Sequence, residues 1–269
     1  MADIPKLINT WQMVEGPVID KETRKVVNPG RLEKTQIPMP ELGPNEALVK
    51  VAGCGVCHTD LGYFYDGVPT VNKPPLALGH EISGTVAAGP DHLVGRNVIV
   101  PAVLPCNNCP ICEAGRGNRC LSQKMPGNSL GIYGGFSDYI PVPADDLCLI
   151  DDLQGLPLSH YAVVADAVTT PYQAAMRAEI KAGDLVMIFG AVGGVGTYVT
   201  QTVKALGAKV VVALDINQEK LENIRRYGAD FIINVKDKDL NAVRDEFRAI
   251  AKQAGVPSNF GWKIFEVTG

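Results

Sequence analysis

The pattern of apolar and polar positions divides the chain into two differently organised parts. Up to about residue 165, short runs rich in β-branched residues lie between stretches of Gly and Pro, as at Ala47–Val51, Asn97–Val100 and Tyr139–Val142. This pattern is typical of a β-rich domain with long loops. Beyond about residue 169, continuous apolar runs typical of buried strands alternate with stretches of helical periodicity. We therefore expect two domains, 1–167 and 168–269.

The second part alternates predicted strands with predicted helices. Its first strand, Leu185–Phe189, is apolar at every position, as expected of a strand buried on both faces of a sheet. The other predicted elements are the strands Lys209–Leu214, Phe231–Val235 and Trp262–Thr268 and the helices Thr170–Glu179, Gly194–Leu206, Gln218–Tyr227 and Leu240–Ala254. This alternation predicts an α/β fold with a parallel, doubly wound sheet.

Composition and charge exclude several classes of protein. The 269 residues are 46% hydrophobic and 20% charged, which is typical of a globular protein with a sizeable core. A formal net charge of −4 offers no general attraction to nucleic acid or to an anionic membrane. The N-terminal stretch lacks the apolar segment of a secretory signal, and no apolar run reaches the ~18 residues of a membrane span, so a cytoplasmic location is expected.

Four cysteines lie within one short segment at the spacing C-x2-C-x2-C-x7-C: Cys106, Cys109, Cys112 and Cys120. Four thiolates so close in sequence predict a closed, tetrahedral structural zinc site. Two disulfides are the first alternative, and the expected compartment disfavours them. An iron–sulfur cluster is the second; its typical cysteine run ends in Cys-Pro, whereas Leu121 follows the last cysteine here.

One stretch of the first domain pairs a thiol, Cys57, with an imidazole, His80. Thr59, Asp60 and Glu81 lie beside them in sequence. Thiolate and imidazole are ligands that zinc prefers, and three protein ligands would leave the fourth position open for a substrate. The spacing is too long for a zinc finger, so a third ligand must come from elsewhere. On this stretch alone, a buried thiol and a satisfied core histidine are the alternative.

A glycine-rich turn follows the first predicted parallel strand. Residues 190–196 read GAVGGVG, and Asp215 lies at the end of the second strand, 19 residues beyond Gly196. Strand, glycine turn, helix and carboxylate together predict a dinucleotide site, although Ala191 departs from the strict pattern. An acidic residue there binds the adenosine ribose and repels a 2′-phosphate, which favours NAD over NADP; the alternative is that Asp215 caps the following helix. The residues expected against the cofactor here are Gly193, Gly194, Val195, Gly196 and Asp215.

The motif Gly-His-Glu at 79–81, the four-cysteine segment and the glycine turn, in this order, resemble the zinc-containing medium-chain alcohol dehydrogenases. The resemblance implies a β-rich, GroES-like catalytic domain followed by a Rossmann-type parallel sheet. It also implies a catalytic zinc held by Cys57, His80 and a third residue just before the helix that leads into the cofactor domain. That position falls on Asp166, where the family often has cysteine. The alternative for Asp166 is a cap for the helix near Thr170.

The resemblance assigns further roles. Two zinc ions per chain, one catalytic and one structural, and NAD are the implied cofactors. Glu81 would lie next to the catalytic metal and Thr59 would carry the substrate proton outward. Among the implied cofactor contacts are His58 near the pyrophosphate, Thr170 near the nicotinamide and Lys220 near the adenosine ribose, with a solvated helix charge as the alternative for Lys220.

Several phrases point to the substrate: GYFYDGV, LPCNNCPICEAGRGNRC, QKMPGN and VVADAVTTPYQA. They resemble a branch of the family that oxidises a cyclic secondary alcohol carried on a CoA thioester in anaerobic aromatic degradation. The resemblance further implies six parallel strands, of which this C-terminally incomplete sheet would hold four, and a homo-oligomer for the full-length protein. The alternatives are a dehydrogenase of another secondary alcohol or polyol, and a zinc-stabilised chain that turns over no substrate.

Overall fold

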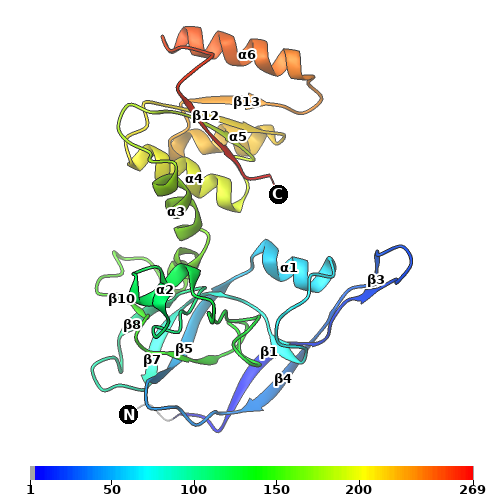
Figure 1. Ribbon diagram of the computed structural model, residues 1–269, viewed down its shortest axis with the longest axis vertical. Helices are drawn as coiled ribbons and strands as arrows, with labels where there is room; N and C mark the ends of the chain where they lie inside the picture. Colours follow the sequence, from blue (N-terminus) through cyan, green and yellow to red (C-terminus); the bar gives the residue numbers. More distant parts are fainter. Residues whose placement is uncertain (1–3, 269) are drawn as a thin grey trace. The chain divides into compact units, whose positions relative to one another are not determined.

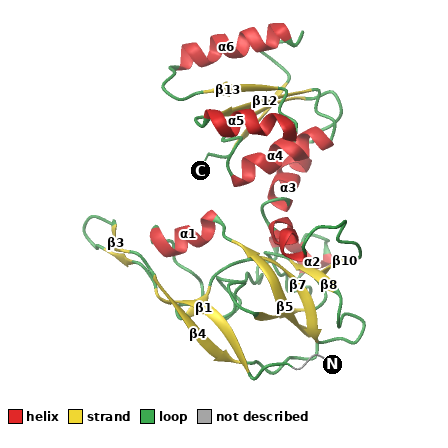
Figure 2. Ribbon diagram, turned by 180° about the vertical axis from the view of Figure 1, so that it is seen from behind, coloured by secondary structure: helices red, strands yellow, loops and turns green. Residues whose placement is uncertain are grey.

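The computed structural model describes residues 4–268, and the chain divides into two compact units between Asp166 and Ala167 (Figure 1). The first unit is built mainly of strands (Figure 2). Its strands are β1 (Leu7–Glu15), β2 (Val18–Ile19), β3 (Val26–Asn28), β4 (Arg31–Pro38), β5 (Glu46–Gly55), β6 (Leu76–Ala77), β7 (Glu81–Ala88), β8 (Asn97–Val100), β9 (Tyr139–Pro143) and β10 (Cys148–Ile150). Its helical segments are α1 (His58–Tyr65), α2 (Pro110–Glu113), η1 (Gly117–Arg119) and η2 (Leu158–Ala165).

Antiparallel pairing organises these strands into a five-stranded sheet of order β10-β8-β7-β5-β9 and a three-stranded sheet of order β4-β1-β6, with β2 and β3 as a separate hairpin. Alternate residues of β5 and β9, such as Ala47, Val49, Ile140 and Val142, point into one core because successive side chains of a strand face opposite ways. The sheet thus supplies a rigid base for the loops that follow β5 and precede β7.

The second unit is a parallel sheet of order β13-β12-β11-β14 with helices on both faces (Figure 2). Its elements are α3 (Thr169–Arg177), β11 (Leu185–Phe189), α4 (Gly194–Ala205), β12 (Val210–Asp215), α5 (Gln218–Ile224), η3 (Arg225–Tyr227), β13 (Phe231–Asn234), α6 (Leu240–Gln253) and β14 (Trp262–Glu266).

The packing of strand β11 explains why its sequence is apolar throughout. Val186 and Ile188 pack with residues of α3, α4 and α5, whereas Leu185 and Met187 pack with Ile250 and its neighbours on α6. Both faces of the strand are therefore buried, which confirms the prediction of a doubly wound sheet.

The elements differ from the predictions in some respects. The strands Asn97–Val100 and Leu185–Phe189 have the predicted bounds, but β1, β4 and β7 were not predicted. The helix expected over Thr170–Glu179 ends at Arg177, because Glu179 has a left-handed backbone (φ 51°) that no α-helix accommodates. No helix within residues 4–268 has the length and apolar character needed to cross a bilayer.

Candidate metal and dinucleotide sites

The pairing of β5 with β7 brings the two halves of the first predicted metal motif together. Gly55, the last residue of β5, pairs with Glu81, the first residue of β7. A side chain on Gly55 would collide with the Glu81 carboxylate, so this close approach requires glycine. Cys57, two residues beyond the end of β5, is the N-cap residue of α1 with an extended backbone (φ −95°, ψ 157°), and it therefore lies beside His80 and Glu81.

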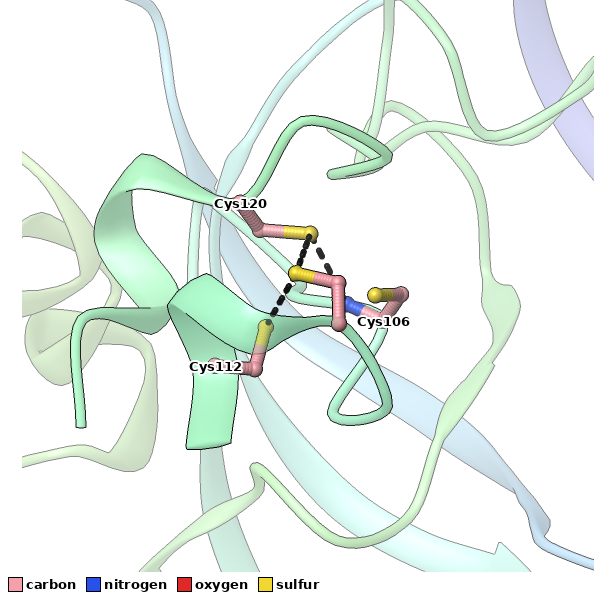
Figure 3. Close-up of side chains that lie close together, drawn as sticks. Cys106, Cys112 and Cys120 are labelled. Atoms are coloured by element: carbon pink, nitrogen blue, oxygen red, sulfur yellow. Dashed lines mark hydrogen bonds between the residues drawn. The ribbon is translucent and has the colours of Figure 1, made fainter. Parts of the chain in front are cut away.

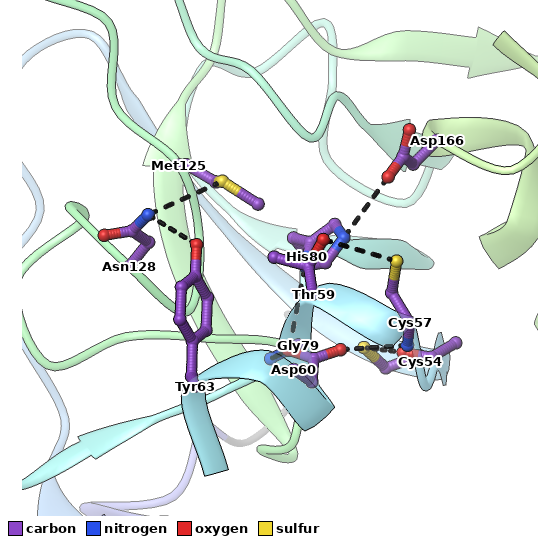
Figure 4. Close-up of polar contacts among 11 residues, drawn as sticks. Cys54, Cys57, Thr59, Asp60, Tyr63, Gly79, His80, Met125, Asn128 and Asp166 are labelled. Atoms are coloured by element: carbon purple, nitrogen blue, oxygen red, sulfur yellow. Dashed lines mark hydrogen bonds and ion pairs between the residues drawn. The ribbon is translucent and has the colours of Figure 1, made fainter. Parts of the chain in front are cut away.

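Four potential ligand atoms converge here, one each from Cys57, His80, Glu81 and Asp166, and all lie within 4.8 Å of one another. Figure 4 shows Cys57, His80 and Asp166 side by side. Asp166 follows directly after η2, 86 positions after His80, and its Oδ2 is 3.3 Å from His80 Nε2. The N-cap position of α3 is Val168, and Asp166 lies two residues before it, so Asp166 does not occupy the cap position itself. Thiolate, imidazole and carboxylate form a donor set that zinc accepts.

His80 carries the clearest sign that this cluster fits a metal ion. The residue is fully buried, and neither ring nitrogen makes a hydrogen bond within the described part of the chain, although carboxylates lie at 3.3 Å (Asp166) and 3.7 Å (Asp60). Burial lowers the pKa of His80, but Asp166, Asp60 and Cys57 outweigh burial and raise it to about 12. A buried imidazole without a hydrogen bond, surrounded by anionic groups, is an environment that a bound cation would satisfy.

Asp60 positions the segments that carry the cluster, a role that the sequence did not predict. The side chain is 3% exposed; its Oδ2 accepts a hydrogen bond from the backbone N–H of Cys57 (3.0 Å) and its Oδ1 one from Gly79 N–H (2.9 Å). It therefore ties together the segments that carry Cys57 and His80. Its position three residues after the N-cap, where an acidic side chain can bond back to the cap residue, was the available signal.

The other residues predicted in this region have different surroundings. Thr59 is the second residue of α1, with its Oγ1 3.7 Å from Cys57 Sγ. The neighbouring His80 imidazole is the main cause that lowers the pKa of the Cys57 thiol. His58, the first residue of α1, is exposed, and Glu81 is 5% exposed.

The four-cysteine segment forms a second cluster of potential metal ligands (Figure 3). Cys109 Sγ is 3.5 Å from Cys112 Sγ and 3.9 Å from Cys120 Sγ. Tetrahedral zinc with Zn–S bonds of about 2.3 Å implies sulfur–sulfur separations of about 3.8 Å, which these distances match. A disulfide requires ~2.05 Å, so the cysteines are thiols, and a multi-iron cluster would hold its sulfurs farther apart.

The surroundings of this cluster explain why the segment would need a metal ion. The short helices α2 and η1 contain no buried residue, so apolar packing contributes little to their order. Backbone N–H groups of Cys106 and Ser122 donate to Cys120 Sγ, both at 3.3 Å, which stabilises a thiolate. The backbone N–H of Cys112 is the main cause that lowers the pKa of Cys109 to about 6.

The glycine turn joins β11 to α4 as predicted, and its glycines fall into two groups. Gly190 has φ 74°, and a side chain on Gly196 would collide with the Gly190 carbonyl, so these two serve the fold itself. Added Cβ atoms on Gly193 and Gly194, both exposed, would meet no atom closer than 3.5 Å. Their lack of side chains instead leaves the N-terminus of α4 open, as close approach of a pyrophosphate requires.

A cavity of about 610 Å³ lies at the carboxyl ends of β11 and β12. Gly193, Asp215 and Lys220 line it, together with Asn217 and Lys236, to which the sequence analysis assigned no role. Asp215 accepts hydrogen bonds from Val192, Ile216 and Asn217 N–H. The N-cap of α5 is Asn217, whose side chain accepts from Lys220 N–H (3.0 Å), so the alternative of Asp215 as that cap is wrong. Of the other predicted contacts, Val195 is exposed near the start of α4 and Thr170 is exposed in α3.

Two family profiles match the two units. The profile described as the alcohol dehydrogenase GroES-like domain matches residues 43–152, and the one described as zinc-binding dehydrogenase matches residues 194–260. An alcohol dehydrogenase of Geobacillus stearothermophilus is 35% identical over 234 residues, which cover 85% of this chain and 67% of that protein. The chain therefore belongs to the zinc-containing medium-chain alcohol dehydrogenase family, with a GroES-like and a Rossmann-type unit.

The chain is also similar to a sorbitol dehydrogenase and to an acetophenone reductase. The sorbitol dehydrogenase of Bacillus subtilis is 30% identical over 227 residues, covering 82% of this chain and 62% of that enzyme. The solved structure of acetophenone reductase from Geotrichum candidum in complex with NAD has a TM-score of 0.72 and 28% identity, covering 89% of this chain and 66% of that one. The chain spans 61–67% of the length of the curated relatives it matches. The family binds zinc and a nicotinamide dinucleotide, and the clusters and the glycine turn described above are suited to both.

Proposed function

We propose that the chain belongs to a zinc-dependent dehydrogenase that oxidises a cyclic secondary alcohol to a ketone with hydride transfer to NAD. The observation that carries this proposal is the convergence of Cys57, His80 and Asp166, with the buried His80 nitrogens lacking hydrogen bonds. In this proposal the three side chains hold the catalytic zinc, Glu81 lies next to it, and the four cysteines hold a structural zinc. Zinc, when bound, polarises the substrate oxygen and lowers the pKa of the alcohol.

The remaining roles belong to side chains of this chain. Thr59, whose hydroxyl faces Cys57 Sγ, is positioned to accept the alcohol proton and pass it outward. Gly193, Gly194, Val195 and Gly196 admit the pyrophosphate at the N-terminus of α4, and Asp215 accepts from the adenosine ribose. His58, Thr170 and Lys220 complete the proposed cofactor contacts.

The substrate that we propose is 6-hydroxycyclohex-1-ene-1-carbonyl-CoA, an intermediate of anaerobic benzoyl-CoA degradation. It is supported by the resemblance of the phrases GYFYDGV, QKMPGN and VVADAVTTPYQA to the dehydrogenase of that compound. The second candidate is a dehydrogenase of another secondary alcohol or polyol, which the similarity to a sorbitol dehydrogenase favours. The proposed location is cytoplasmic, and the full-length protein is proposed to form a homo-oligomer.

A substrate panel tests the proposal. NADH formation is followed for the chain with this CoA ester, with cyclohexanol and with sorbitol, before and after zinc is removed by a chelator. We expect turnover with a clear preference for the CoA ester, loss of turnover on chelation and recovery when zinc is restored. Preference for sorbitol would support the second candidate. Zinc-free protein that still turns over would contradict the proposed chemistry.

A fluorescence titration with NADH separates an inactive enzyme from a chain that binds no cofactor. The proposal expects saturable binding that weakens when Gly194 is replaced by a bulkier residue. A Gly194→Val substitution is suitable because an added Cβ meets no protein atom, so the fold should tolerate the change. Absence of NADH binding to the unmodified chain would favour a zinc-stabilised protein without dehydrogenase activity.

A further inference from the structure

Asn128 connects three segments of the first unit (Figure 4). Its Oδ1 accepts a hydrogen bond from the backbone N–H of Val71 (2.7 Å), and its backbone carbonyl accepts one from Asn72 N–H (2.9 Å). Its Nδ2 lies 2.7 Å from the Oη of Tyr63 on α1. The loop that follows the four-cysteine segment is thereby tied to α1 and to the chain before β6.

These contacts determine the direction of the hydrogen bond at Tyr63. A backbone N–H only donates, so the Asn128 atom that faces Val71 is the carbonyl oxygen, and the amide nitrogen must face Tyr63. An amide nitrogen also only donates, so Tyr63 Oη is the acceptor in this bond. The phenol has one hydrogen of its own to donate, and within residues 4–268 Tyr63 donates it to no group.

Tyr63 is close to the candidate catalytic cluster. It lies one helical turn after Thr59, so the two side chains share a face of α1. Figure 4 shows Thr59 beside His80 and the Tyr63 hydroxyl beside Asn128, and the charges of His80, Asp60 and Cys57 all act on Tyr63. The residue is 6% exposed, so little of its surface is in contact with bulk water. Burial raises the pKa of Tyr63, and the neighbouring His80 acts in the opposite direction, so the phenol keeps its proton at neutral pH.

We propose that Tyr63 donates this hydrogen to a second oxygen of the substrate, next to the alcohol that is oxidised, and that Asn128 is the positioning residue that keeps Tyr63 a donor. This inference rests on the proposed dehydrogenase function. It assigns the substrate to the hydroxy-carbonyl class, in which a ketone, ester or thioester oxygen lies near the reacting carbinol. A simple alcohol without such an oxygen leaves the donor unused.

The test compares two ring alcohols, methyl 2-hydroxycyclohexane-1-carboxylate and cyclohexanol, which differ by one ester group. Tyr63→Phe removes the donor. Asn128→Asp keeps the acceptor for the Val71 N–H but presents a carboxylate oxygen to Tyr63. A carboxylate only accepts, so the phenol donates its hydrogen to this side chain and can no longer donate it to a substrate. For both variants we expect the ratio of kcat/KM for the ester to kcat/KM for cyclohexanol to fall about tenfold, as expected for one lost hydrogen bond.

The double variant provides an internal check. If both substitutions remove the same donor, combining them lowers the ratio no further than either one alone. Tyr65→Phe, on the same helix but half exposed, is the control and should leave the ratio unchanged. Zinc content per chain is measured for every variant, so that a damaged metal site is recognised separately from a lost donor.

The outcomes distinguish the inference from the function on which it rests. If the unmodified chain oxidises both alcohols and the variants lower both activities equally, or neither, the hydrogen-bond assignment is wrong while the dehydrogenase proposal stands. If the unmodified chain oxidises neither these two alcohols nor the CoA ester, the proposed function fails and the inference with it. A selective loss for the ester supports the assignment, because general structural damage would not discriminate between the two substrates.

Discussion

The two clusters of potential metal ligands differ in how the chain assembles them. The four cysteines lie within 15 residues and converge through short turns with almost no buried apolar surface. Cys57, His80 and Asp166 span 110 residues and converge because β5 pairs with β7 and because η2 ends beside them. The first cluster is local and has little apolar packing around it, so we expect it to depend on metal for its order, whereas we expect the fold to hold the second in place.

A further difference lies in the chemistry of the donors. Four thiolates close the coordination sphere of a zinc ion, which suits a structural site. The mixed cluster offers one thiol, one imidazole and two carboxylates, of which we assign three as ligands, so one position stays open to a substrate oxygen. Removing metal from the two clusters should therefore have different consequences, in stability for one and in turnover for the other.

The largest expected effect is on activity and follows from Cys57→Ser. The variant should lose one of two zinc ions per chain, and kcat/KM should fall on the order of 10³-fold or more because the main electrostatic stabiliser of the reaction is lost. Zinc content and NADH formation are measured together. Cys148→Ser is the matched control, since Cys148 is exposed and belongs to neither cluster. An active Cys57→Ser protein with one zinc would exclude the proposed site.

The largest expected effect on the stability of the fold follows from Cys109→Ser. This variant removes the central thiolate of the local cluster, and we expect the free energy of unfolding to fall by about 3 kcal/mol or more, because metal binding orders this segment. Thermal unfolding and zinc content provide the measurement. The mixed cluster should keep its zinc. Loss of both ions together would show that the two clusters are not independent.

Asp60→Asn tests whether the fold preorganises the mixed cluster. Each oxygen of Asp60 accepts a hydrogen bond from one backbone N–H, that of Cys57 or that of Gly79. In asparagine one of these oxygens becomes an NH2 group, which cannot accept, so one of the two hydrogen bonds is lost. We expect zinc affinity at this cluster to fall about 10–100-fold, the usual range for residues that support metal ligands. Competition with a zinc chelator measures this, and Asp66→Asn, an exposed residue at the end of α1, is the control. An unchanged affinity would show that Asp60 does not position the ligands.

The smallest expected effect concerns pH. The raised pKa of His80, about 12, means that the metal-free protein holds a proton there throughout the neutral range. This proton stabilises the metal-free fold below the ordinary histidine pKa, and the contribution is lost only as the pH rises toward 12. Zinc must displace it, so affinity at the mixed cluster should rise about tenfold per pH unit.

The measurement uses the Cys109→Ser variant, in which only the mixed cluster binds zinc. Chelator competition at two neutral pH values one unit apart gives the slope, and calorimetry in buffers of different ionisation enthalpy counts the protons released. A zinc affinity that does not change with pH would contradict the protonated state assigned to His80.

The same contrast explains how much could be predicted from sequence. The four-cysteine segment could be predicted because its ligands are neighbours in sequence, and the parallel sheet because β11 is apolar throughout and strands alternate with helices. Strand β1 was missed because its inward-facing residues include Thr10 (2% exposed) and Gln12 (5%), while Leu7 and Trp11 face outward. Each face of β1 thus carries both polar and apolar residues, and only pairing with β4 and β6 defines it as a strand.

Asp60 was missed for a related reason. Nothing in its sequence neighbourhood shows that the N–H of Gly79, 19 positions away, becomes its partner, since that contact arises where α1 packs against the segment before β7. The position of Asp166 was expected only through family resemblance, because a single carboxylate far along the chain carries no pattern. Sites built by topology are thus harder to predict than sites built by spacing.

The most direct test of the central claim is anomalous diffraction from crystals of the zinc-loaded chain, recorded on both sides of the zinc absorption edge. The account predicts two zinc peaks per chain, one within the four cysteines and one bound by Cys57 Sγ, His80 Nε2 and an Asp166 oxygen. A single peak at the cysteine segment, or a second peak that Asp166 does not contact, would contradict it.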